Sequence, residues 1–170
     1  MRLVDPLLME FDREASTTRK MLERLPDDKL GWKPHPRSMS LAKLSWHLAT
    51  IPGWVAAGVL KDGHDLSAGG LGSSEPPATA AAIQEAFVTN TLAAKSAMSQ
   101  LDDTRALGSW KLSAGPRTIL EMPRLAFLRT ILLNHSIHHR GQLTVYFRLL
   151  DLPVPAIYGP SADENPFGRG

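Results

Sequence analysis

Four stretches of this chain repeat apolar residues every three or four positions, the spacing that gives a helix one buried face. No two segments alternate apolar and polar residues convincingly enough to predict a pair of strands. Four helices of about 20 to 30 residues predict an all-α fold, a four-helix bundle, in a single domain over residues 1–170. The stretches run from Asp5-Pro6 to about residue 25, from Ser40 to about Lys61, from Thr79 to Leu101, and from between Thr118 and Pro123 to about Asp151.

Capping residues and helix breakers set the predicted boundaries of these helices. Asp5 is expected to cap the first helix and Ser40 the second, because both side chains accept hydrogen bonds from free backbone N–H groups. The Gly-, Ser- and Pro-rich residues 62–78 predict a mobile loop, and residues 103–118 read as irregular with a short extended piece. The tail, residues 152–170, is rich in proline and glycine, so we expect it to be extended and packed against the surface.

Three histidines stand out because of where they fall on the predicted helices: His47, His135 and His139. Residues four apart on a helix lie only about 40° apart around its axis, one turn above the other. The imidazoles of His135 and His139 can therefore bind one divalent ion, and His47 on the second helix can face them. The spacing predicts a site with three nitrogen ligands and room for water or a substrate.

His135 and His139 lie within the apolar stripe of the last predicted helix. Burying polar groups there costs free energy unless each group finds a hydrogen-bond partner. Gln142 follows on the same stripe one turn after His139, where it can hydrogen-bond a ligand imidazole or a bound water. His138 points about 100° away from His139, which favours a half-exposed histidine, although a pair of His135 with His138 stays open. The stripe consists of Leu128, Ile131, Leu132, Leu143, Tyr146, Leu149 and Leu150.

Each histidine also has a purely structural interpretation. His47 lies on the flank of the apolar face marked by Leu44, Ile51 and Val55, where a single histidine is more often a hydrogen-bonded core residue than a ligand. An HxxxH spacing alone is likewise common on helices without a metal. The metal interpretation rests on the three positions taken together.

Composition narrows the chemistry further. The chain contains no cysteine, so disulfides, thiolate ligands and cysteine nucleophiles are excluded. The net charge is only +2 and the basic residues are interleaved with acidic ones, so we expect no nucleic-acid partner. No segment has the apolar length of a signal peptide or a membrane span, so we expect a cytoplasmic protein with no membrane partner.

The sequence resembles the DinB-like family, also called the DinB/YfiT-like family of proposed metalloenzymes. The resemblance covers most of the chain and rests on Trp32-Lys33-Pro34, on Leu44-Ser45-Trp46-His47, and on the run from His135 to Gln142, which reads HSIHHRGQ. It implies a four-helix bundle, often a homodimer, in which His47, His135 and His139 bind a divalent metal such as zinc or nickel. It also makes the second histidine of the pair at 138–139 the ligand.

Relatives in this family that are better understood are S-transferases and isomerases that use bacillithiol, mycothiol or similar thiols. The resemblance therefore implies a metal-dependent enzyme acting on a small molecule, with a low-molecular-weight thiol as cosubstrate because the chain has no cysteine. Two alternatives stay open: a hydrolase that uses metal hydroxide, and a metal- or small-molecule-binding bundle without turnover. No catalytic residue can be assigned, because HExxH is absent and the carboxylates of Glu10, Asp12, Glu14 and Glu121 carry no distinguishing signal.

Overall fold

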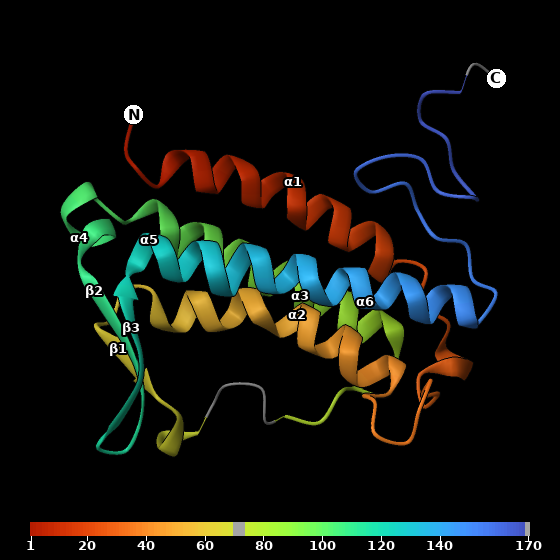
Figure 1. Cartoon of the computed structure of the whole chain (residues 1–170), viewed down its shortest axis with the longest axis horizontal. Coiled ribbons are helices and arrows are strands. Elements are labelled where there is room, and N and C mark those ends of the chain that lie inside the picture. The colour runs from red at the N-terminus through yellow and green to blue at the C-terminus, as the bar shows by residue number, and fades with distance from the viewer. Residues whose placement is uncertain (70–73, 169–170) are drawn as a thin grey trace.

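A computed structural model describes residues 1–69 and 74–168. It confirms the four-helix bundle, whose long helices lie side by side with the amino-terminal and last helices on one side of the other two (Figure 1). The last helix is built in three consecutive parts, of which the middle one has π-helical hydrogen bonding. The elements of the bundle are α1 (Asp5–Leu22), α2 (Leu41–Gly58), α3 (Ala80–Ser99), and the run of α5 (Arg124–Phe127), the π-helical segment Leu128–Asn134 and α6 (His135–Leu149).

Of the two expected caps, Ser40 is confirmed and Asp5 is wrong. The side chain of Ser40 accepts a hydrogen bond from the N–H of Lys43 at 3.2 Å, which caps α2. Thr79 caps α3 in the same way. Asp5 is instead the first residue of α1, and its carboxylate accepts the N–H and binds the guanidinium of Arg2. This carboxylate therefore faces the residues before the helix rather than the free N–H groups of its first turn.

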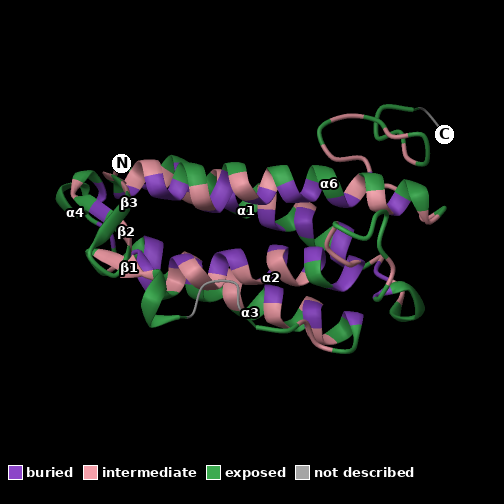
Figure 2. Ribbon diagram, turned by 60° about the horizontal axis from the view of Figure 1, so that its bottom comes forward, coloured by how far each residue is buried: buried purple, intermediate pink, exposed green. Residues whose placement is uncertain are grey.

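The buried faces of the helices follow the predicted apolar spacing. Buried residues form stripes that face inward along each long helix, and exposed residues cover the outside (Figure 2). Helix α2 packs along both α3 and α6, so its apolar residues are buried on two sides. The buried residues of α1 include Leu7, Phe11, Ala15, Thr18 and Leu22, and those of α3 include Ile83, Phe87, Ala94 and Met98. Leu25 and Leu101 continue the two stripes just beyond these helices.

A three-stranded sheet at one end of the bundle corrects the prediction that the chain has no paired strands. Its strands are β1 (Gly63–Asp65), β2 (Ser109–Ala114) and β3 (Arg117–Pro123), in the order β1-β2-β3. Strand β1 is parallel to β2, and β2 is antiparallel to β3. The last helix therefore begins at Arg124, later than predicted, because the residues before it pair as a strand.

A tight turn at Gly115 joins β2 to β3. Gly115 turns the chain with a φ of +56°, a conformation that glycine adopts readily, and its N–H is held by Asp65 at 2.9 Å. The loop expected over 62–78 is thus partly ordered as β1 and a short 3₁₀ turn at Leu66–Ala68, while its residues 70–73 lie outside the described part of the chain. Residues 103–118 likewise contain a short helix, α4 (Asp103–Leu107), before the hairpin.

Arg124 attaches the sheet to the bundle. Its guanidinium is only 4% exposed and donates to the carbonyls of Val59 at 3.0 Å, Lys61 at 2.8 Å and Ser109 at 3.0 Å. The contacts with Val59 and Lys61 satisfy free carbonyl groups just beyond the end of α2, and the contact with Ser109 holds the start of β2. They fix the start of the last helix against the end of α2, the helix that carries His47.

The carboxyl-terminal tail is extended, as predicted. Residues 152–168 contain no helix or strand and lie against α1 and α6. The hydroxyl of Tyr158 donates to Glu14 at 2.7 Å and accepts from Arg140 at 2.7 Å. An ion pair between Arg24 and Glu164 holds the tail further along. Among the helices of the described residues, none combines the length and apolar character needed to span a membrane.

Candidate metal centre

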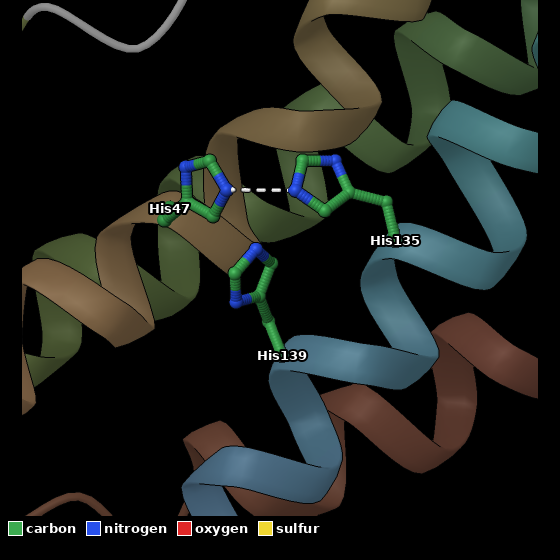
Figure 3. A group of neighbouring side chains, drawn as sticks. All are labelled: His47, His135 and His139. Atoms are coloured by element: carbon green, nitrogen blue, oxygen red, sulfur yellow. Dashed lines mark hydrogen bonds between the residues drawn. The ribbon is translucent and has the colours of Figure 1, made fainter.

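The imidazoles of His47, His135 and His139 converge between α2 and α6 (Figure 3). Each ring offers one nitrogen, and these nitrogens all lie within 4.8 Å of one another. The Nε2 atoms of His47 and His135 are 3.2 Å apart. The ring centroids are 4.4 Å apart for His47 and His139, and 4.5 Å apart for His135 and His139. The structure thus brings together all three histidines singled out in the sequence.

The separation of these nitrogens suits a small divalent ion. Two nitrogen ligands at 2.0–2.1 Å from a tetrahedral zinc ion are about 3.3 Å apart. The observed 3.2 Å between Nε2 of His47 and Nε2 of His135 is close to this value. Three protein nitrogens leave a fourth position for an exogenous ligand. The group could therefore hold a metal ion.

Helical geometry places each ring. His135 and His139 lie one turn apart on α6, so their side chains leave the helix on the same side. His135 is the first residue of α6, and its N–H donates to the carbonyl of Thr130, five residues earlier. A π-helical turn of this kind changes the rotation of the residues that follow it, and such turns are frequent at functional sites. The π-helical segment is a feature that the apolar pattern did not predict.

Gln142 lies against the outer nitrogen of His139. Its Oε1 is 2.7 Å from Nδ1 of His139, so Nδ1–H donates to the amide oxygen and Nε2 is left with a free lone pair. A hydrogen bond of this kind fixes the tautomer and the orientation of a metal-binding histidine. His138 is exposed, as expected, with its ring beside that of His139 and outside the cluster.

Burial keeps the three rings neutral. It lowers the pKa of His47 to about 4, and the nearby His139 and His135 add to the shift. Burial likewise lowers the pKa of His135 to about 4, with contributions from His139 and His138. The pKa of His139 is lowered by burial too, against the opposing effect of its hydrogen bond to Gln142. Only neutral imidazole binds a metal ion, so the rings are in the required state at neutral pH.

An aromatic ring borders the cluster. The ring of Trp54, on α2, lies edge-on to His47 with centroids 5.0 Å apart, and 6.1 Å from the ring of His135. Nδ1 of His135 is buried and has no hydrogen-bond partner among the described residues. Trp54 lies seven residues after His47 and therefore on the same side of α2. This spacing was the signal in the sequence from which its contact with His47 could have been predicted.

The carboxylates considered in the sequence lie elsewhere. No Asp or Glu of the described residues joins the histidine group. Glu14 binds Arg140, which is 1% exposed and turned towards α1, so the arginine of the HSIHHRGQ run serves packing. Glu10 pairs with Arg129. Asp12 and Glu121 lie in ion pairs with Lys95 and Lys111.

A helical bundle with three histidines facing one another from two adjacent helices belongs to the class of bundle proteins with a candidate metal centre in the core. The model of the DinB family matches residues 2–166 of the chain. The chain therefore belongs to the DinB family.

Individual relatives agree with this assignment. The uncharacterized protein YrdA of Bacillus subtilis (strain 168) is 28% identical over 162 residues, which are 95% of this chain and 91% of the relative. A DinB-like protein from Bacillus cereus ATCC 10987 superposes with a TM-score of 0.71 at 26% identity, over 89% of this chain and 95% of its own. The DinB-like protein YjoA of Bacillus subtilis superposes with a TM-score of 0.71 over 91% of this chain and 98% of its own; at 20% identity it shows the fold alone.

Proposed function

We propose that the protein binds one divalent metal ion through His47, His135 and His139 and is a metal-dependent enzyme acting on a small molecule. The observation that carries the proposal is the convergence of three neutral imidazole nitrogens within 4.8 Å. Zinc and nickel both suit a site made of imidazole nitrogens.

Thiol chemistry is the reaction that these surroundings favour. A divalent ion with an open position would lower the pKa of a thiol or water bound there and so supply a nucleophile at neutral pH. In hydrolysis the attacking metal hydroxide still carries a proton, and the leaving group must gain one, so a nearby side chain that moves protons assists the reaction. No carboxylate of the described residues joins the histidines. A metal-bound thiolate carries no proton and needs no such group for its attack. Because the chain has no cysteine, the thiol would be a low-molecular-weight cosubstrate.

The chain's own groups would then orient and enclose the site. Gln142 holds the ring of His139 so that Nε2 faces the cluster. The indole of Trp54 covers the side of the cluster next to His47 and limits access of water there. Burial keeps the imidazoles of His47 and His135 unprotonated. The lack of a nearby carboxylate equally suits the second candidate, a metal- or small-molecule-binding protein without turnover.

Metal analysis tests the binding site. Protein purified without a metal-affinity column should contain about one divalent ion per chain, and His47→Ala, His135→Ala and His139→Ala should each lose most of it. His138→Ala is the matched control, because it removes an exposed imidazole next to the cluster. Full metal content in His139→Ala, or loss of metal in His138→Ala alone, would refute this ligand set.

Turnover assays then separate the candidate functions. Metal-loaded protein is tested with electrophiles in the presence of bacillithiol, mycothiol or glutathione, and with esters and amides in the absence of thiol. Metal-dependent turnover only with a thiol supports the transferase, and turnover only without one supports the hydrolase. If neither thiols nor substrates change the spectrum of a cobalt-substituted sample, the result supports a metal-binding protein without turnover.

A further inference from the structure

A groove lies between the segment that precedes α2 and the helix α6, and one of its lining residues, Gln142, contacts His139 of the candidate metal centre. Its volume is about 430 Å³, within the range of small-molecule sites. One wall is the segment before α2 and the other is the carboxyl-terminal half of α6. The lining residues are Arg37, Ser38, Met39, Gln142, Val145 and Tyr146.

Hydrogen bonds within the chain form this groove before any ligand binds. The hydroxyl of Tyr146 donates to the carbonyl of Met39 at 3.0 Å, which ties the two walls together. The ring of Tyr146 also packs edge-on against Trp32, with centroids 5.7 Å apart. In the segment before α2, Nδ1 of His35 accepts the N–H of Arg37 at 3.2 Å. A wall fixed in this way loses little conformational entropy on binding.

Gln142 joins the groove to the metal centre. Its Oε1 accepts from His139, while its Nε2 makes no hydrogen bond to the described residues. The amide N–H groups are therefore available to a ligand in the groove, next to the ring of a proposed metal ligand. From His139 to Tyr146 the helix rises about 10 Å, so a molecule of this length would span from the cluster to the far end of the groove.

The side chains that line the groove indicate the class of ligand that it could bind. Arg37 is exposed at the rim, and no carboxylate of the described residues pairs with its guanidinium. The groove also presents apolar surface, including Val145, which is 57% exposed, and the half-buried Met39. A guanidinium beside apolar surface suits an anionic group attached to an apolar body.

We propose that this groove binds the anionic end of the substrate or cosubstrate, with Arg37 bound to its carboxylate or phosphate, while Gln142 donates to the part of the same molecule that lies nearest the metal. The apolar body of the molecule lies on Met39, Val145 and Tyr146. The part of this inference that places the reacting end of the molecule at the metal rests on the proposed function. The part that places the anionic end at Arg37 rests only on the residues of the groove.

The anion-binding end is tested on metal-free full-length protein by ¹⁵N NMR titration with hexanoate, hexyl phosphate and hexanol. Hexanoate or hexyl phosphate should shift the amide resonances of residues 37–39 and 142–146, and should bind about three- to tenfold more tightly than hexanol. The tighter of the two anions identifies the group. Arg37→Gln should reduce anion binding to the level of hexanol. The control Arg117→Gln removes an exposed arginine of the β2–β3 hairpin and should bind as the wild type does. Equal binding by Arg37→Gln, or shifts confined to other residues, overturns the proposal.

A cobalt-loaded sample tests the connection to the metal. There, 8-mercaptooctanoate should bind about three- to tenfold more tightly than 8-mercaptooctanol, and Arg37→Gln should abolish that difference. If both thiols leave the cobalt spectrum unchanged while hexanoate still binds at Arg37, the proposed thiol chemistry fails and the anion site stands. If both thiols bind equally in the wild type, the anion site does not serve the metal centre and the proposal is wrong.

Discussion

Metal-free protein should lose stability as the pH falls from 7 to 5, because two half-buried histidines, His47 and His135, resist protonation in the folded state. The pKa of His47 and that of His135 are both lowered from 6.5 to about 4 by burial among like groups. In the unfolded chain these rings take up protons near pH 6.5, while in the folded chain they do so only near pH 4. The unfolded state therefore binds more protons between these values. Stability is complete above pH 6.5 and is lost as the pH falls towards 4.

The size of the loss follows from these shifts. One pKa unit corresponds to about 1.4 kcal/mol. Solvent still reaches both half-buried rings, so we discount the full value and expect about 1–2 kcal/mol for each ring. Most of this change should fall above pH 5, where Asp and Glu side chains, with ordinary pKa values of 3.8 and 4.5, remain ionised.

Urea unfolding at a series of pH values, with a chelator present, measures the loss. Between pH 7 and 5 the wild type should lose about 1–3 kcal/mol of its free energy of unfolding. The double variant His47→Gln with His135→Gln should lose clearly less, with only the smaller contribution of His139 left in the cluster. His35→Gln, which alters an exposed loop histidine, is the control and should follow the wild type. Parallel curves for the wild type and the double variant would refute the assignment of the lowered pKa values to the cluster.

Three further outcomes are expected. Gln142→Ala should weaken metal binding about 10- to 100-fold in a competition titration, because the hydrogen bond that orients His139 is lost; unchanged affinity would mean that the amide serves packing alone. Asn90→Ala should lower the free energy of unfolding by about 1 kcal/mol in urea, since Nδ2 of Asn90 donates to the carbonyl of Ala49 at 2.8 Å between α2 and α3; no change would show that water replaces this donor. Light scattering at tens of micromolar should detect a homodimer, as the family resemblance implies, and a monomer at that concentration would contradict it.

The helices and the three histidines were predictable for the same reason. A helix places residues three and four apart on one face, so buried positions such as Phe11 and Ile83 reveal themselves by spacing alone. The same spacing predicts that His135 and His139 share a face of the helix. It also predicts the contact between His139 and Gln142, which are three residues apart. These relations are local, and the chain's own geometry fixes them.

The sheet was not predictable in this way. Most residues of β3 are exposed, so their apolar and polar residues need not alternate in the pattern of a half-buried strand. Strand β1 is only three residues long and pairs with a segment that lies more than forty residues away, as Gly63 does with Lys111. The π-helical turn before His135 could not be predicted from the apolar pattern either. It changes the carbonyl to which each backbone N–H donates, but it does not change which residues are apolar.

The sequence by itself determined the four helices, the absence of thiol chemistry within the chain, and which histidines share a face of the last helix. Only the tertiary structure decided that Nε2 of His47 lies 3.2 Å from Nε2 of His135, because that distance depends on how α2 packs against α6. It also decided that Arg140 binds Glu14 on α1, and that Arg37 lies on a groove with Gln142. Spacing along a helix is set by local backbone geometry, whereas contacts between helices are set by the packing of side chains across the whole core.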